Sequence, residues 1–359
     1  MTAASQNHPS RLMVMAGGTG GHVFPALAVA KSLQAQGTQI TWLGTRRGLE
    51  AKVIPENQIP IEWVSVEGLR GKSAASLVLA PFKLLRALWQ SLAAIRRVKP
   101  DCVLGMGGFV AGPGGVAARL LGRPLIVHEQ NAVAGLTNKY LAKIASRVLT
   151  GFPKVAELPS SATWVGNPVR EAITTARSNL SPSINVLIIG GSQGAHSFNV
   201  KLPAVFKQLA LENISIWHQC GRGRGVQTSA DYQELGVEAK VSEFIDDMAA
   251  AYHWADLLIC RAGAMTIAEC CAAGRPALFV PYPFSAGDHQ LKNAEVMVSV
   301  GAAKLLSNDQ IDKPEMLQAL RALLTEKSLL KEMGDQASSL HKPDALNDVV
   351  AVCQEYLNA

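Results

Sequence analysis

The sequence lacks the features that mark several classes of protein. It has no uninterrupted run of 18 apolar residues, so we expect no segment that crosses a membrane. The stretch Met1–Ser10 is polar and does not contain the apolar core of a secretory signal peptide. The six cysteines form no Cys-x-x-Cys pair and have no zinc-ligand spacing. We therefore expect reduced cytosolic thiols that lie mostly in the core.

Length and charge indicate two globular domains with different surfaces. A chain of 359 residues with 48% hydrophobic and 17% charged residues is too long for one ordinary core and too apolar to be disordered. Residues 1–166 carry 18 Lys and Arg against 7 Asp and Glu, whereas residues 167–359 carry 16 against 21. The basic first half predicts contact with a polyanionic surface, either nucleic acid or an anionic membrane leaflet.

A glycine-rich loop follows an apolar run near the start of each half. The first loop reads GGTGGH over Gly17–His22, and the second reads GGSQGA over Gly190–Ala195. Glycines let the backbone approach an anion, and the free N–H groups of the following helix favour negative charge. Two such loops, one in each half, predict two Rossmann-like domains of the nucleotide-binding type.

Strand and helix signals alternate along both halves, as is typical of doubly wound parallel sheets. Buried strands are expected in the first half at 12–16, 40–43, 61–66, 102–106, 125–128 and 148–150. In the second half they are expected at 185–189, 215–219, 240–244, 257–260, 277–281 and 303–306. The glycine and proline of Val165–Arg170 mark a turn between domains. We therefore expect an α/β fold with domains at 1–166 and 167–344, and a last helix at 345–359 that packs back on the first domain.

The stretch Leu69–Lys99 contains seven basic residues and no acidic residue. If Pro81 begins a helix, one apolar stripe is expected to pack on the core, and it consists of Leu84, Leu88 and Ile95. A second apolar stripe, flanked by Arg86 and Arg97, consists of Phe82, Leu85 and Trp89. Two interpretations are open. Either both stripes belong to one broad face that is buried in the core, or the first stripe packs on the core and the second contacts an apolar environment outside the protein. We expect the second stripe to contact an anionic membrane surface.

Five motifs occur in one order along the chain. They are GGTGGH at 17–22, HEQNA at 128–132, GGSQGA at 190–195, RAGAMTIAE at 261–269 and DHQLKNA at 288–294. Together they closely resemble the MurG-type N-acetylglucosaminyltransferases of peptidoglycan synthesis. The resemblance implies a GT-B fold, in which two Rossmann-like domains face a cleft. It also implies that N-acetylglucosamine moves from UDP-N-acetylglucosamine, with inversion, to the 4-hydroxyl of the muramoyl sugar in undecaprenyl-linked lipid I, which makes lipid II.

The resemblance assigns the donor mainly to the second domain. It implies that Glu269 accepts hydrogen bonds from the ribose hydroxyls, as the acidic residue of dinucleotide folds does, and that the main chain of Ile245 contacts the uracil edge. The loop at Ser192 is expected to hold the diphosphate, with Arg170 adding a positive charge beside it. The remaining expected donor contacts are Thr19, Gly20, Gly21, Asn131, Ala264, Met265, Thr266, Ile267, Ala268 and Gln290.

His22 is the candidate general base. Its imidazole follows a glycine-rich loop and can take a proton near neutral pH, and the family's proposed base matches this position; the alternative is a histidine that anchors the loop. Gly107 and Gly108 follow another strand and are expected to hold the acceptor diphosphate. The sequence has no Asp-x-Asp motif, so we expect no required protein-bound metal and no other cofactor, and a divalent ion that binds together with the diphosphate stays open as an alternative.

The expected partners are UDP-N-acetylglucosamine, lipid I and an anionic membrane surface, with no nucleic acid. The protein is expected to act at the cytoplasmic face of the inner membrane, where other cell-wall synthesis proteins are further candidate partners. Two alternatives share part of this pattern: a UDP-N-acetylglucosamine 2-epimerase, which needs no lipid, and a non-catalytic scaffold that senses a nucleotide at the membrane. An NAD dehydrogenase fits less well, because neither loop has plain G-x-G-x-x-G spacing followed by a ribose-binding acid.

Overall fold

The computed structural model describes residues 9–67, 79–170, 172–173, 183–191 and 195–358. The chain divides into two compact units, of which unit 1 comprises Met1–Pro168 with Asp344–Ala359 and unit 2 comprises Val169–Pro343. The sequence places the first boundary at residue 166, and the structure places it at Pro168. The last helix belongs to unit 1 although it follows unit 2 in the sequence. Within the described ranges, no helix is both long enough and apolar enough to cross a membrane.

Unit 1 contains a seven-stranded sheet in the order β3-β2-β1-β4-β5-β6-β7, and every pair in it is parallel. Its strands are β1 (Arg11–Met15), β2 (Gln39–Gly44), β3 (Ile61–Trp63), β4 (Cys102–Gly105), β5 (Leu125–Glu129), β6 (Arg147–Thr150) and β7 (Thr163–Trp164). The first six lie where the sequence predicts strands. The sequence did not predict β7, because two residues at a sheet edge carry no periodic signal.

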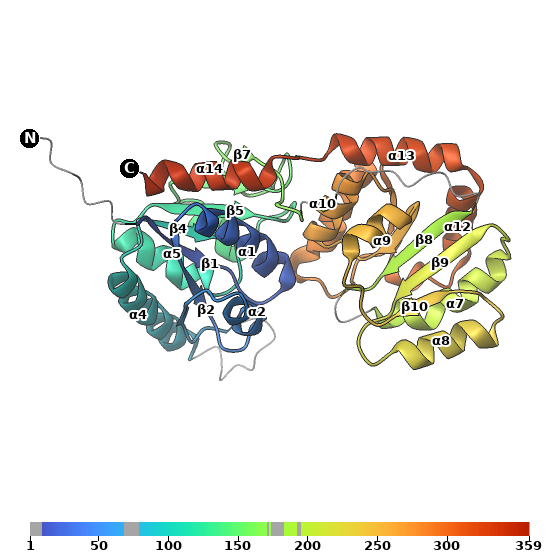
Figure 1. The fold of residues 1–359 in the computed structure, drawn as a ribbon, viewed down its shortest axis with the longest axis horizontal. Coiled ribbons are helices and arrows are strands. Elements are labelled where there is room, and N and C mark those ends of the chain that lie inside the picture. The colour runs from blue at the N-terminus through green and yellow to red at the C-terminus, as the bar shows by residue number, and fades with distance from the viewer. Residues whose placement is uncertain (1–8, 68–78, 171, 174–182, 192–194, 359) are drawn as a thin grey trace, which may run out of the picture. The chain divides into compact units, whose positions relative to one another are not determined.

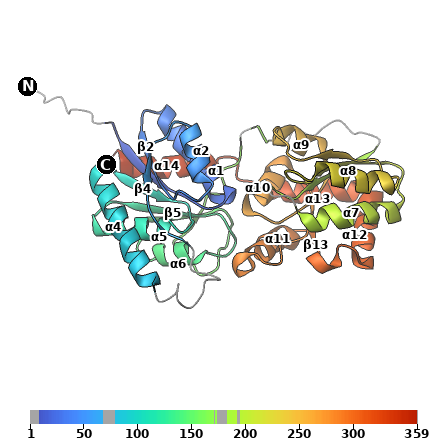
Figure 2. The same ribbon diagram turned by 90° about the horizontal axis from the view of Figure 1, so that it is seen from below.

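Helices cover both faces of this sheet (Figures 1 and 2). They are α1 (Gly20–Ala35), α2 (Glu50–Glu56), α4 (Ala80–Val98), α5 (Ala111–Leu120), α6 (Leu136–Leu141) and α14 (Ala345–Leu357). Successive residues of a strand point to opposite faces. Leu12 and Val14 of β1 pack with α1 and α14, whereas Met13 and Met15 pack with α4 and α5. β1 therefore contributes to two cores, one on each face of the sheet.

The helix predicted to begin at Pro81 is α4, and its orientation corrects one prediction. Its buried side chains are small for the most part, and they are Ala80, Ala87, Ser91, Ala94 and Ile95. Leu84, which the sequence assigns to the core, is 43% exposed, and Leu88 is half-buried. The small residues let α4 lie close against α5, and this packing turns Leu84 outward. The prediction is wrong for Leu84 but right for Ile95, which is buried, and for Leu88, which packs half-buried against the same core.

Unit 2 contains a six-stranded parallel sheet in the order β10-β9-β8-β11-β12-β13. The strands are β8 (Ile184–Ile189), β9 (Ile214–Gln219), β10 (Lys240–Ser242), β11 (Leu257–Cys260), β12 (Ala277–Phe279) and β13 (Ala303–Leu305). The helices are α7 (His196–Leu209), α8 (Gly225–Glu234), α9 (Met248–Trp254), α10 (Ala264–Ala273), α11 (His289–Ser299), α12 (Pro314–Thr325) and α13 (Lys327–Ser339). All six strands match predicted ones. All six cysteines of the chain are buried free thiols, as the sequence predicts.

Candidate active site

In each unit the glycine-rich loop lies where the strand order reverses. β1 lies between β2 and β4, and β8 lies between β9 and β11. Loops from the carboxyl ends of the two central strands meet at such a point, which is where open α/β sheets bind ligands. In unit 1 these loops contain Gly17–Gly21 and Gly107–Gly108. In unit 2 the described parts of these loops contain Gly190–Gly191 and Arg261–Gly263.

The two loops of unit 1 are in direct contact. Gly107 and Gly108 have φ angles of +103° and +83°, which favour glycine. A Cβ atom on Gly108 would lie 2.4 Å from the carbonyl oxygen of Gly17, and one on Gly107 would lie 2.9 Å from the ring of His22. The structure therefore places the predicted acceptor loop against the predicted base. The contact leaves no room for a side chain at Gly107 or Gly108.

A buried carboxylate that the sequence did not reveal fixes the first loop. Glu50 begins α2 and is fully buried. Its Oε2 accepts a hydrogen bond from the Gly18 N–H at 3.0 Å, and its Oε1 accepts from the N–H and the hydroxyl of Thr45 at 3.0 and 2.7 Å. The Gly18 N–H therefore already donates its hydrogen bond to a carboxylate of the protein itself. Any phosphate at this loop must be bound by other groups.

His22 lies in the first turn of α1 and belongs to a chain of polar side chains. Its Nδ1 is 2.9 Å from Oε1 of Gln130. Nε2 of Gln130 is 3.2 Å from Nδ1 of His128, and Nε2 of His128 is 2.9 Å from the carbonyl oxygen of Gly166. Burial lowers the pKa of His128, although its hydrogen bond to Gly166 opposes this. The His128 imidazole is therefore neutral under physiological conditions.

Asn131 is oriented by Glu129, a buried carboxylate at the end of β5. Oε1 of Glu129 accepts from the backbone N–H and the side-chain Nδ2 of Asn131 at 2.9 and 3.0 Å. Its Oε2 accepts from the Gly135 N–H at 3.1 Å and from Nδ2 of Asn138 at 2.8 Å. Four donors thus compensate the buried charge. The sequence assigns a role to Asn131, and the structure adds the carboxylate that holds it.

Glu269 is the centre of the polar cluster in unit 2. It lies on α10 and is 9% exposed. Its Oε1 is 3.3 Å from a guanidinium nitrogen of Arg170, and its Oε2 accepts a hydrogen bond from the Tyr252 hydroxyl at 2.9 Å. Burial raises the pKa of Glu269, and the charge of Arg170 is the main opposing influence. The structure thus joins two predicted residues that are far apart in sequence, and it adds Tyr252, which sequence reasoning missed.

Comparisons with known proteins cover nearly the whole chain. Residues 12–150 match the glycosyltransferase family 28 N-terminal domain, and residues 185–349 match the C-terminal domain of the same family. The chain belongs to glycosyltransferase family 28. It is therefore an enzyme of the glycosyltransferase class, and its two Rossmann-like units are those of the GT-B fold.

Two relatives are similar to this family 28 chain over nearly their full lengths. The UDP-N-acetylglucosamine–N-acetylmuramyl-(pentapeptide) pyrophosphoryl-undecaprenol N-acetylglucosamine transferase of Methylococcus capsulatus is 48% identical over 97% of this chain and 99% of its own length. The crystal structure of MurG from Acinetobacter baumannii has a TM-score of 0.86 at 42% identity, over 97% of this chain and all of that one. A putative UDP-N-acetylglucosamine 2-epimerase from Listeria monocytogenes has a TM-score of 0.67, but its 14% identity shows a shared fold alone.

The other residues expected to contact the donor fall into four positions of the family 28 fold. Thr19, Gly20 and Gly21 lie at the start of α1, and Ala264, Met265, Thr266, Ile267 and Ala268 form the start of α10. Ile245 is buried between β10 and α9, and Gln290 lies at the start of α11, where its Oε1 accepts from the Tyr282 N–H at 2.8 Å. Ile245 and Ile267 are both buried. Ser192 lies outside the described residues.

Proposed function

We propose that this protein transfers N-acetylglucosamine from UDP-N-acetylglucosamine to the muramoyl 4-hydroxyl of lipid I and so makes lipid II. The relatives named for this activity support the substrates. The observation that carries the donor half is Glu269, because a buried carboxylate held by Tyr252 and Arg170 at the binding edge of unit 2 suits the paired hydroxyls of a ribose. The start of α10 offers N–H groups to a diphosphate.

In the reaction that we propose, His22 acts as general base. The acceptor hydroxyl attacks the anomeric carbon while the bond from that carbon to the UDP oxygen breaks on the opposite face, so the configuration inverts. The hydroxyl proton passes to the imidazole of His22. Negative charge grows on the departing diphosphate, and Arg170 together with the N–H groups at the start of α10 offsets it. We propose these groups, and not a resident metal ion, for that task.

A transfer assay tests this function against the two alternatives. The protein is incubated with labelled UDP-N-acetylglucosamine, with and without a lipid I analogue, and the products are separated. The proposal expects a labelled disaccharide lipid and free UDP, and both should depend on the acceptor. Formation of UDP-N-acetylmannosamine without acceptor would instead support a 2-epimerase. Donor binding with no turnover in either reaction would support a scaffold.

Tyr252 provides a test of the donor site that the sequence did not suggest. We expect Tyr252→Phe to weaken UDP binding by roughly 0.5–1.5 kcal/mol, because it removes the hydrogen bond that orients Glu269. Titration calorimetry measures the effect. Tyr232→Phe is the matched control, since it removes another buried hydroxyl of unit 2, one that bonds to His218 at 3.0 Å. An equal loss of UDP affinity in both variants would contradict the assignment.

We propose that the α4 side of unit 1 is the surface that meets the membrane at its cytoplasmic face. Phe82, Leu85 and Trp89 are 70%, 55% and 67% exposed, which argues against one broad buried face. Exposed basic residues surround them, and those within the described residues include Lys83, Arg86 and Arg96. Arg70 and Lys72 of the same basic run lie outside the described residues. Large exposed apolar side chains among basic ones suit an anionic lipid surface.

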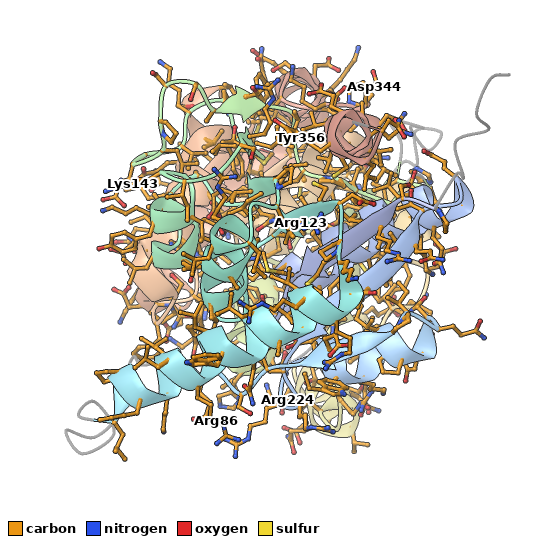
Figure 3. All side chains as sticks on the ribbon, turned by 90° about the vertical axis from the view of Figure 1, so that its left-hand side faces the viewer. Arg86, Arg123, Lys143, Arg224, Asp344 and Tyr356 are labelled. Atoms are coloured by element: carbon orange, nitrogen blue, oxygen red, sulfur yellow. The ribbon has the colours of Figure 1, made fainter. Side chains whose placement is uncertain are left out.

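Neighbouring helices extend this surface. α4, α5 and α6 lie on one face of the sheet, and Figure 3 looks onto their side of unit 1, with Arg86, Arg123 and Lys143 labelled. Further exposed apolar residues on α5 and α6 are Leu120, Leu136 and Tyr140. Lys143 adds a positive charge 5.6 Å from the ring centre of Tyr140. The surface thus combines charge with apolar contact over three helices.

We expect Phe82→Ser combined with Trp89→Ser to weaken binding to anionic vesicles by about tenfold or more, because both rings leave water when α4 meets lipid. Co-sedimentation with vesicles that contain phosphatidylglycerol measures the binding. The matched control is Val200→Ser with Val226→Ser, which removes two exposed apolar residues from unit 2. UDP affinity and the melting temperature should be unchanged in both double variants. Unchanged sedimentation, or a lowered melt that shows a core role, would contradict the membrane assignment.

A further inference from the structure

We propose that Gln130 is a positioning residue that holds His22 in one tautomer, with the proton on Nδ1 and with Nε2 as the proton acceptor. The inference rests on the proposed function, in which His22 accepts the proton of the sugar hydroxyl. A neutral imidazole has two tautomers, and only the nitrogen without a proton can act as a base. The tautomer of His22 is decided by a series of hydrogen bonds that runs from the carbonyl of Gly166 through His128 and Gln130 to His22.

The direction of the hydrogen bonds is set first at Gly166. Its carbonyl oxygen can only accept, and it lies 2.9 Å from Nε2 of His128, so that nitrogen carries a proton. Since His128 is fully buried and its pKa is lowered by burial, the ring is neutral. Nδ1 of His128 therefore has no proton and accepts a hydrogen bond.

The amide of Gln130 is oriented by two acceptors. Its nitrogen lies 3.2 Å from Nδ1 of His128 and 3.2 Å from the backbone carbonyl oxygen of His128. A reversed amide would turn its own oxygen toward both of these acceptors and lose both hydrogen bonds. Gln130 is 1% exposed, and its backbone carbonyl accepts a hydrogen bond from Asn167 at 3.0 Å. The amide is therefore fixed with its nitrogen toward His128 and its oxygen toward His22.

The orientation of Gln130 then determines the tautomer of His22. Oε1 of Gln130 can only accept, and it lies 2.9 Å from Nδ1 of His22, so Nδ1 carries the proton of the neutral ring. Nε2 is left with its lone pair. The edge formed by Nδ1 and Cε1 faces Gly107, where a Cβ atom would lie 2.9 Å away. Two backbone carbonyls, those of Gly166 and His128, thus decide through Gln130 which nitrogen of His22 is the base.

The direct test is ¹⁵N NMR of the histidine side chains in the full chain without substrate, with the His22 signals assigned by their loss in His22→Ala. We expect wild-type His22 to show a protonated Nδ1 and an unprotonated Nε2. Gln130→Met keeps the size of the side chain but cannot accept the proton, and it should shift His22 toward the other tautomer. Gln130→Glu keeps an acceptor for Nδ1 and should preserve the tautomer. A wild-type His22 that carries its proton mainly on Nε2 would overturn the proposal.

Turnover gives a second readout that simple packing would not produce. Gln130→Met should lower kcat by about 10²-fold and leave the KM for UDP-N-acetylglucosamine unchanged, because a base in the wrong tautomer cannot accept the proton. Gln130→Glu should retain more activity than Gln130→Met, although burying a carboxylate lowers the melting temperature. If Gln130 only fills space, Gln130→Met should retain more activity than Gln130→Glu, and that result would overturn the proposal. The NMR result requires no turnover, so a wild-type protein without transferase activity would overturn the proposed function and leave the tautomer assignment standing.

Discussion

Replacing His22 by alanine is expected to lower turnover at saturating UDP-N-acetylglucosamine by about 10²–10⁴-fold, the usual contribution of a general base. The imidazole acts on the acceptor hydroxyl only as the new bond forms, so its removal affects kcat and kcat/KM more than ground-state binding. UDP affinity should change little, because Glu269, Arg170 and Tyr252 all belong to unit 2. The measurement combines initial rates with a lipid I analogue and calorimetry with UDP.

The alternative role of His22, as an anchor of its loop, predicts a different result. In that case His22→Ala would weaken UDP-N-acetylglucosamine binding and leave turnover at saturating donor intact. His341→Ala, which removes a half-buried histidine of unit 2, is the control for loss of an imidazole as such. Its kinetics should match those of wild type.

Replacing Glu269 by alanine is expected to weaken UDP binding by roughly 1–3 kcal/mol, because the ribose hydroxyls lose their acceptor in a buried site. The substitution also removes the partner of the Tyr252 hydroxyl and the anion that faces Arg170. Glu269→Gln keeps the size of the side chain and one acceptor oxygen, so its loss of affinity should be smaller. Calorimetry of UDP with both variants gives the comparison.

Glu332 provides the matched control for charge. It is exposed on α13 in the same unit, and Glu332→Ala removes one carboxylate without touching the cluster around Glu269. Wild-type UDP affinity in Glu269→Ala would mean that another group holds the ribose. A melting temperature lowered well below that of Glu332→Ala would show how much the buried cluster contributes to folding, and binding would then be measured at a temperature where both variants are folded.

The strands could be predicted from the sequence because a parallel sheet buries both of its faces. Val186–Ile189 is an unbroken apolar run, and such runs are readily recognised when glycine-rich loops follow them. The orientation of α4 could not be predicted in the same way. A hydrophobicity pattern favours Leu84 for the core, whereas close packing against α5 selects the small side chains of Ala87 and Ser91.

The residues of the candidate site also differ in whether the sequence could identify them. Ordered motifs identified His22 and Glu269, since their neighbours in sequence carry the signal. Glu50 and Tyr252 gave no such signal, because their importance lies in hydrogen bonds to residues elsewhere in the fold, to the Gly18 loop and to Glu269. A buried glutamate and an exposed one look alike in a sequence. The role of Gln130 likewise depends on a backbone carbonyl, that of Gly166, which no side-chain pattern encodes.

The position of α14 has a consequence for the order in which the protein is made. Val349, Val350 and Cys353 of this helix fill the same core as Leu12 and Val14 of β1. A ribosome produces all of unit 2 before it produces Asp344–Ala359. Throughout that interval, one face of the first sheet to be synthesised lacks part of its apolar cover. Unit 2 can become compact during translation, whereas unit 1, which contains the proposed base, is completed last.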